Sequence, residues 1–253
     1  MEWWQILAIS LGGALLLFLL SIVLYRQFFK RFWDVVLSGA AIVVLSPLFL
    51  LLIVLCACFM KGNPFFVQKR PGKKDKSGNE RIFRLIKFRT MTNEKDASGN
   101  LLPDEKRLNK FGKFLRSTSL DELPELFNIF VGQMSIVGPR PQLVKDMLFM
   151  NEEQRRRHDV RPGLSGLAQV SGRNNITWEQ KFAFDLEYVR KITLPRDARI
   201  VLKTALVVLS RKDTVREGTA SDMDYCDWLV QEGKLNQEEF VEKEQEARVT
   251  TKG

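Results

Sequence analysis

The chain has 253 residues, with 39 Lys and Arg, 30 Asp and Glu, three Cys and one His, and its net charge is +9. One histidine, His158, argues against a zinc site built from several histidines and against a serine–histidine nucleophile, so catalysis here would rest on carboxylates and cations. The stretch from Thr219 to Gly253 has nine acidic and four basic residues, and the rest of the chain carries a net charge of +14. That surface suits anionic partners such as lipid headgroups, phosphorylated substrates or nucleic acid.

The first apolar run, Ile6–Tyr25, is uncharged and has the length of one membrane span. A cleaved signal peptide would need a basic start and a small-residue cleavage site, so the run predicts a retained anchor. No basic residue precedes the run, whereas Arg26, Lys30 and Arg31 follow it. The positive-inside bias therefore predicts that its C-terminal end faces the cytoplasm.

A second run, Val35–Phe59, contains no charged residue but has Ser46 and Pro47 in its middle. Basic residues flank both ends, and an ordinary span would place the second basic group outside. Proline breaks a helix, and serine re-satisfies freed backbone groups, so the helix can enter and return on the same side. A kinked span is the alternative, and the residues alone leave both open.

The following segment predicts a β-hairpin over residues 65–91, from PFFVQKR, a turn-rich stretch and RIFRLIKFRTM. One face of the second strand carries Phe83, Leu85, Lys87 and Arg89. Its two cations form either a solvated edge or a surface that binds phosphate. Residues 92–109 are expected to form a loop. From Lys110 to Arg116, aromatic and basic residues interleave, which suits a membrane surface or, alternatively, core packing.

The motif DELPEL predicts a helix that begins between Asp121 and Leu123, because Pro124 is tolerated only in a first turn. Asp121 and Glu122 would then lie at the positive end of the helix dipole. Asp121 is either a simple N-cap or part of a reactive site. In the second case, Asp121 and Glu122, beside Arg116, would hold a divalent cation, and a carboxylate would attack a phosphorus atom.

The loop Gly138-Pro139-Arg140-Pro141 presents one arginine, suited to phosphate or simply solvated. Further along, EEQRRR at 152–157 is expected to be a solvated helix face, and Thr177 with Gln180 predicts a capping box. Residues 198–210 are apolar but too short to span a membrane, so they are core or interfacial. Neither glycine-rich nucleotide loop motif occurs in the sequence.

Several long motifs resemble those of the bacterial sugar transferases called monotopic phosphoglycosyl transferases, from about Arg31 to Arg211. In chain order they are KRPGK, FRLIKFRTM, RSTSLDELPELFNIFVGQMSIVGPRP, VRPGLSGLAQVSGRN, FDLEYV and LPRDARIVLKT. The resemblance implies transfer of a phospho-sugar from a UDP-sugar to a polyprenyl (undecaprenyl) phosphate, with release of UMP.

The resemblance also implies roles for individual residues. Asp121 would be the nucleophile that forms a covalent phospho-sugar intermediate, and Glu122 would help to hold Mg²⁺. The matched phosphate- and nucleotide-binding positions are Lys87, Arg116, Arg140 and Asp197. The family's helix-breaking Ser-Pro matches Ser46 and Pro47, and in that family the broken helix is re-entrant.

The expected protein is a membrane-associated α+β enzyme of the bacterial inner membrane, with its catalytic domain facing the cytoplasm. Residues 1–30 would form a transmembrane anchor helix, 31–61 a re-entrant helix, 62–216 the cytosolic catalytic domain and 217–253 an acidic polar tail. The expected partners are a UDP-sugar, polyprenyl phosphate and membrane lipids, with no nucleic acid, and the anchor would allow a homodimer. The alternatives are a membrane-tethered basic module that binds anionic lipid or nucleic acid, and a phosphatase that uses the aspartate.

Overall fold

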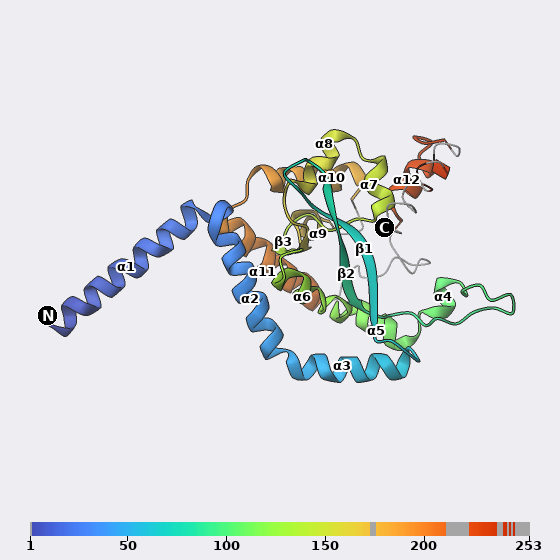
Figure 1. Ribbon diagram of the computed structural model, residues 1–253, viewed down its shortest axis with the longest axis horizontal. Coiled ribbons are helices and arrows are strands. Elements are labelled where there is room, and N and C mark those ends of the chain that lie inside the picture. Colours follow the sequence, from blue (N-terminus) through green and yellow to red (C-terminus); the bar gives the residue numbers. More distant parts are fainter. Residues whose placement is uncertain are drawn as a thin grey trace.

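A computed structural model gives the structure of the protein and describes residues 2–172, 176–210, 223–236, 240, 241, 243 and 245. It has a long N-terminal helix that points away from a mixed domain of helices and short strands (Figure 1). The α+β class predicted from the sequence is therefore confirmed. The predicted boundary at residue 216 lies outside the described residues.

Two helices and a π-helical turn form the N-terminal part of the chain before the bend: α1 (Trp3–Val23), η1 (Tyr25–Phe29) and α2 (Lys30–Val44). The prediction that the first apolar run is helical is confirmed. Within the described residues, no single helix meets the length and hydropathy expected of a membrane span. That this run anchors the protein in a membrane stays a prediction.

The second apolar run forms α2 and α3 (Ser46–Phe59), which bend by 65° at a break after Val44. Together, Tyr25–Val44 and Ser46–Phe59 have the length and composition of a broken span or a re-entrant loop. Pro47 lies in the first turn of α3, where its missing N–H is not needed, and the Ser46 hydroxyl donates to the Val43 carbonyl at 2.8 Å. The predicted break at Ser46 and Pro47 is confirmed.

The predicted hairpin is present as two antiparallel strands, β1 (Phe65–Lys74) and β2 (Glu80–Phe88), with Phe65 opposite Phe88. The pairing becomes irregular between Pro71 and Lys74. A second pair, β3 (Ser135–Val137) and β4 (Gly163–Ser165), is parallel and joins segments that flank the predicted arginine loop. The two pairs form separate two-stranded sheets.

The helices of the domain are short, apart from two near its C-terminal end. They are α4 (Asp104–Arg107), α5 (Lys110–Ser117), the 3₁₀ turn η2 (Leu120–Glu122), α6 (Glu125–Phe130), α7 (Val144–Phe149), α8 (Glu152–Arg155), the 3₁₀ turn η3 (Arg156–Asp159), α9 (Leu167–Ser171), α10 (Trp178–Arg190), α11 (Leu194–Ser210) and α12 (Tyr225–Gln231). The capping box predicted at Thr177 and Gln180 is confirmed at the start of α10.

The main core lies where α3 packs against the hairpin, α5 and α6. Its buried residues include Phe49, Leu52 and Cys56 of α3 together with Phe83 and Phe88 of β2, and the ring centroids of Phe49 and Phe88 are 6.1 Å apart. Leu115 of α5 is fully buried in this core, whereas Phe114 is 48% exposed. The basic amphipathic stretch is thus a core helix on one face and leaves an aromatic residue exposed on the other.

One prediction needs correction. The segment at 152–157 is not solvated throughout, because Arg157 in η3 is only 2% exposed and binds a partner from α10. The structure describes part of the predicted acidic tail, and there Tyr225 and Cys226 of α12 are buried, with Tyr225 packed against Trp178 and Phe182. Aromatic burial fixes this helix on the domain despite its acidic surroundings.

Candidate active site

A carboxylate held by two cations marks the candidate site. Glu122 in η2 accepts hydrogen bonds on one oxygen, Oε1, from Lys87 Nζ at 2.8 Å and from Arg140 Nη2 at 2.5 Å. Lys87 comes from β2, and Arg140 comes from the loop after β3. The structure therefore brings together three predicted site residues that are far apart in the sequence.

The local backbone conformation explains how Asp121 and Glu122 come to lie near Lys87 and Arg140. Ser119 adopts the left-handed conformation, with φ 55°, and this ends the run of α5. A 3₁₀ turn, Leu120–Glu122, follows, and α6 begins only at Glu125, with Pro124 in the cap position. The predicted helix start between Asp121 and Leu123 is therefore wrong by a few residues, because the strained turn intervenes. Lys87 and Arg140, rather than a helix dipole, supply the positive charge.

The charges in this cluster shift one another's pKa values. Burial alone would raise the pKa of Glu122, but Arg140 and Lys87 outweigh it and hold that pKa well below the usual range. The carboxylate of Glu122 in turn raises the pKa of Arg140. For Lys87, burial favours the neutral amine, but Glu122 and Glu125 outweigh it and raise the pKa. The three groups are therefore charged at neutral pH.

Asp121 differs from its neighbour Glu122. Burial, and next the charge of Glu122, raise the pKa of Asp121 to about 6, against the opposing effects of Lys87, Arg140 and Arg116. Among the described residues, no side chain donates a hydrogen bond to its carboxylate. A mostly ionised carboxylate with free lone pairs near three cations is chemically suited to attack an electrophile that carries negative charge.

A third carboxylate, Glu125, was not singled out in the sequence. It is 2% exposed, and its Oε1 lies 3.1 Å from Lys87 Nζ, so Lys87 bridges Glu122 and Glu125. Burial raises the pKa of Glu125 to about 7. Glu122 and Glu125 are three residues apart, a spacing that places two side chains on one face of a helical turn. This spacing is the sequence signal that would have identified Glu125.

Arg116 lies beside this cluster, on α5. Its Nε donates to the Thr90 hydroxyl at 3.0 Å, just beyond the end of β2, and its charge favours the ionised form of Asp121. Asp197, by contrast, is not among the groups that contact the cluster. Its carboxylate accepts from the Tyr25 hydroxyl at 2.8 Å, from Lys30 Nζ at 2.6 Å and from the Tyr188 hydroxyl at 2.9 Å. It ties α11 to the start of α2.

Arg140 is itself supported by a buried ion pair that the sequence did not reveal. Arg157 Nη2 donates to the Arg140 carbonyl at 2.7 Å and to Asp185 Oδ2 at 2.7 Å, and Arg157 Nε adds a second bond to Asp185 at 3.0 Å. The pair links η3 and α10 to the arginine loop. His158, next to Arg157, lies against Glu80 instead and is not near the cluster's carboxylates.

A Mg²⁺ ion fits the side chains that are present. Mg²⁺ is usually bound by one or two carboxylates together with substrate phosphates, rather than by a full protein cage. Asp121 has no donor from the described residues, and the second oxygen of Glu122 has none either. The described residues contain no group of three or more His, Cys, Asp or Glu able to hold a metal alone, so the substrate would complete the coordination.

Adjacent carboxylates among fixed cations, without a histidine in the cluster, are chemically suited to a site that binds and transfers a phosphorylated group. The family model described as bacterial sugar transferase matches residues 25–211. The chain belongs to this family, and it is therefore an enzyme.

Three relatives illustrate the family. The chain is 44% identical over 182 residues to the uncharacterized sugar transferase EpsL of Bacillus subtilis, an alignment that covers 71% of this chain and 87% of EpsL. It is 37% identical over 190 residues to the UDP-glucose:undecaprenyl-phosphate glucose-1-phosphate transferase of Klebsiella pneumoniae, covering 70% of this chain and 39% of the relative. It is 36% identical over 209 residues to the undecaprenyl-phosphate galactose phosphotransferase of Salmonella typhimurium, covering 73% of this chain and 41% of the relative.

Proposed function

We propose that this protein transfers a sugar 1-phosphate from a UDP-sugar to undecaprenyl phosphate and releases UMP. The observation that carries the proposal is the arrangement around Glu122, where Lys87 and Arg140 converge on one carboxylate oxygen. The neighbouring Asp121 receives no side-chain hydrogen bond from the described residues. The names of the Klebsiella and Salmonella relatives supply the substrate class.

In the proposed mechanism, an Asp121 oxygen attacks the phosphorus that carries the sugar. The bond from that phosphorus to the bridging oxygen breaks, and UMP leaves with the oxygen. A phosphate oxygen of undecaprenyl phosphate then attacks the same phosphorus and displaces Asp121, which returns as a carboxylate. Each step exchanges one phosphorus–oxygen bond for another, so no proton donor as strong as a histidinium is required.

The other residues of the cluster hold the reactants in this mechanism. Lys87, Arg116 and Arg140 neutralise the diphosphate and orient it, and such fixed cations act most strongly where water is excluded. Glu122 fixes Lys87 and Arg140 and, with Asp121, would hold Mg²⁺. When bound, Mg²⁺ supplies further charge neutralisation on the phosphate oxygens. Asp197 is a positioning residue in this scheme, through its bonds to Tyr188 and Lys30.

The proposal includes a membrane arrangement. Residues 1–30 anchor the chain, residues 31–61 enter the inner leaflet and return at Ser46 and Pro47, and the catalytic domain of residues 62–216 faces the cytoplasm of the bacterial inner membrane. Residues 217–253 form an acidic extension of that domain. Exposed apolar residues on α3, such as Leu50, Leu51 and Val54, support contact with acyl chains. Pairing of two copies through the anchor is part of the same proposal.

The test is UMP release by detergent-solubilised full-length protein from a panel of UDP-sugars, with undecaprenyl phosphate and Mg²⁺. Wild type should release UMP with one donor, and Asp121→Asn should release none while unfolding at the wild-type temperature. Glu105→Gln, which removes an exposed carboxylate from α4, is the matched control and should keep full turnover.

Other outcomes would overturn parts of the proposal. Wild-type turnover in Asp121→Asn would exclude the nucleophile, and an unchanged Mg²⁺ titration in Glu122→Ala would exclude the metal role. Inorganic phosphate in place of UMP would indicate a phosphatase. Salt-sensitive binding of anionic lipid or nucleic acid without any turnover would indicate a basic binding module.

A further inference from the structure

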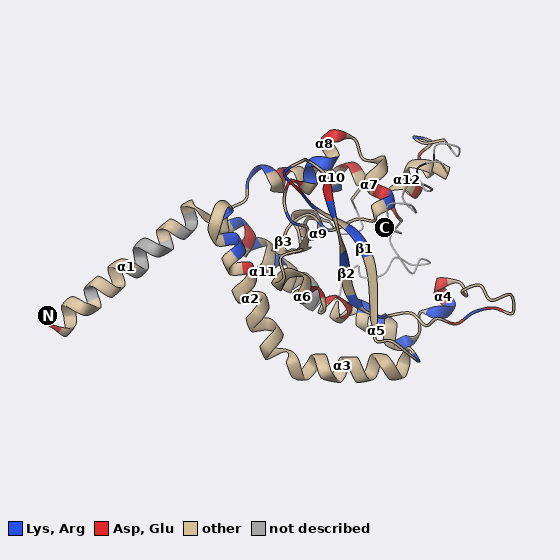
Figure 2. Cartoon of the chain, viewed as in Figure 1, with Lys and Arg blue, Asp and Glu red and all other residues tan. Residues whose placement is uncertain are grey.

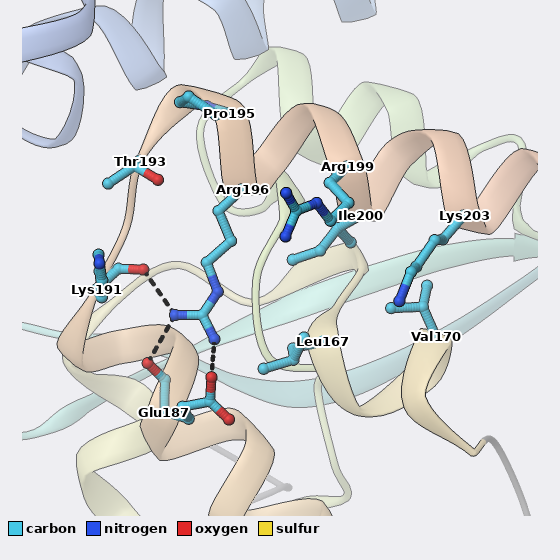
Figure 3. Close-up of a pocket in the computed structure, with 10 residues that line it drawn as sticks. All are labelled: Leu167, Val170, Glu187, Lys191, Thr193, Pro195, Arg196, Arg199, Ile200 and Lys203. Atoms are coloured by element: carbon cyan, nitrogen blue, oxygen red, sulfur yellow. Dashed lines mark hydrogen bonds and ion pairs between the residues drawn. The ribbon is translucent and has the colours of Figure 1, made fainter.

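A cavity separate from the Asp121–Glu122 cluster lies between α9, the end of α10 and α11, on the part of the domain close to the start of α2. It has a volume of about 460 Å³, and its floor is apolar, formed by Leu167, Val170 and Ile200. Figure 3 shows Arg199 and Lys203 extending from α11 above Leu167 and Val170 of α9. None of the residues that line it belongs to the Asp121–Glu122 cluster.

The charge around this cavity is unbalanced. Four of its lining residues are cationic and one, Glu187, is acidic. Glu187 is already occupied, because Arg196 forms an ion pair with its carboxylate and donates to the Lys191 carbonyl at 3.0 Å (Figure 3). Within the described part of the chain, Lys191, Arg199 and Lys203 have no acidic partner, and all three are exposed. The cavity therefore attracts an anion with at least one phosphate-like charge.

The outer face of α11 identifies the kind of anion. Leu202 and Leu206 are each 67% exposed, and they lie one turn apart beside the stripe that carries Arg199 and Lys203. A helix with cations next to exposed leucines is typical of one that lies at a lipid interface, with the cations reaching headgroup phosphates. A free phosphate ion would make no use of the leucines.

The position of α11 agrees with this occupant. Asp197 in its first turn binds Tyr25 and Lys30, at the junction where η1 passes into α2. Basic residues colour this junction and the loop that leads into α11 (Figure 2). The cavity thus lies beside the segment that begins the proposed membrane-inserted pair.

We infer that the cavity between α9, α10 and α11 binds the headgroup phosphate of an anionic phospholipid, at a site separate from the catalytic cluster. Lys191, Arg199 and Lys203 hold the phosphate, the apolar floor receives the glycerol region, and Leu202 and Leu206 contact the acyl chains. The inference rests on the proposed membrane arrangement, not on the proposed chemistry. It makes the phospholipid a ligand that fixes the depth of the domain at the bilayer surface.

The test compares soluble short-chain probes on full-length protein in a neutral detergent. The dissociation constant is obtained from the rise of the unfolding temperature with probe concentration. Dioctanoyl phosphatidylglycerol should stabilise the wild type, and dioctanoyl phosphatidylcholine and glycerol 3-phosphate should bind at least tenfold more weakly. In Arg199→Gln/Lys203→Gln, the dissociation constant for phosphatidylglycerol should rise at least tenfold.

The matched control is Lys73→Gln/Lys76→Gln, which removes two exposed charges from the hairpin end and should bind phosphatidylglycerol like the wild type. Equal weakening in both double variants would refute the site, and equal binding of glycerol 3-phosphate would reassign it to free phosphate. A tenfold rise in KM for undecaprenyl phosphate in the α11 variant would make the cavity the acceptor site and overturn the assignment. Wild type that binds the phospholipid but releases no UMP would refute the proposed chemistry alone.

Discussion

The buried pair of Arg157 and Asp185 makes a sharp stability prediction. Both residues are at most 3% exposed, so Asp185→Asn leaves the guanidinium of Arg157 buried without a counter-charge. Breaking a buried pair in this way costs about 3–5 kcal/mol. For a domain of this size, ~1 kcal/mol lowers the unfolding temperature by about 2–4 °C, so the variant should unfold roughly 6–20 °C below the wild type.

The assay is tryptophan fluorescence during heating of the detergent-solubilised protein. Glu153→Gln is the control, because Glu153 and Arg190 are 3.8 Å apart and about two-thirds exposed, and such a pair contributes ~0–1 kcal/mol. The double variant Arg157→Met/Asp185→Leu should recover much of the lost stability, because it removes both buried charges. Burial raises the pKa of Asp185 even beside Arg157, which indicates that desolvation of the pair is costly. An Asp185→Asn variant that unfolds within about 2 °C of the control would show that the buried pair does not stabilise the fold.

Three further predictions concern the site and the bend. The pKa of Glu125 is raised from 4.5 to about 7, so the folded state holds this proton more tightly than the unfolded state does. The free energy of unfolding of the wild type should therefore fall as the pH rises from 4.5 to about 7. Urea unfolding at several pH values should show no such fall in Glu125→Gln. A Cβ on Gly112 would lie 1.9 Å from the Thr90 carbonyl oxygen, so Gly112→Ala should cost about 1–3 kcal/mol in the same assay, whereas Lys113→Ala, exposed on the same helix, should cost little. Pro47→Ala alone should leave α3 in place. In a background without native cysteines, Lys61→Cys reports the position of residue 61, and a thiol reagent should label it from the side of the catalytic domain. Labelling from the opposite side of the membrane would contradict this prediction.

Local patterns in the sequence predicted the elements but not the partners of buried charges. Alternating aromatic and branched residues identified β2, and the Thr177 capping box identified α10, because both depend on neighbours in the chain. The burial of Arg157 depends on Asp185, 28 residues away, and on the Arg140 carbonyl, 17 residues away. An arginine in a charged run carries no local sign of such a partner.

The residues of the candidate site could be predicted where they belong to motifs that resemble those of the family. The motif resemblance identified Lys87, Glu122 and Arg140, and the structure brings these three into contact. It also identified Asp197, whose carboxylate is instead taken up by Tyr25, Lys30 and Tyr188. A motif records that a residue is important for the fold or the chemistry, and only the contacts separate the two.

The shape of the broken helix follows from proline and from packing together. Proline costs about 3 kcal/mol inside a helix, but Pro47 lies in the first turn of α3, where that cost does not arise. Phe49 and Leu52 are 6% and 2% exposed in the core, and burying each contributes about 1.5–3 kcal/mol. A straight continuation of α2 would place Pro47 in a helix interior, at a cost of about 3 kcal/mol, and would also withdraw Phe49 and Leu52 from the core. Pro47 therefore fixes where α2 ends, and core contacts such as that of Phe49 with Phe88 hold α3 in its bent position.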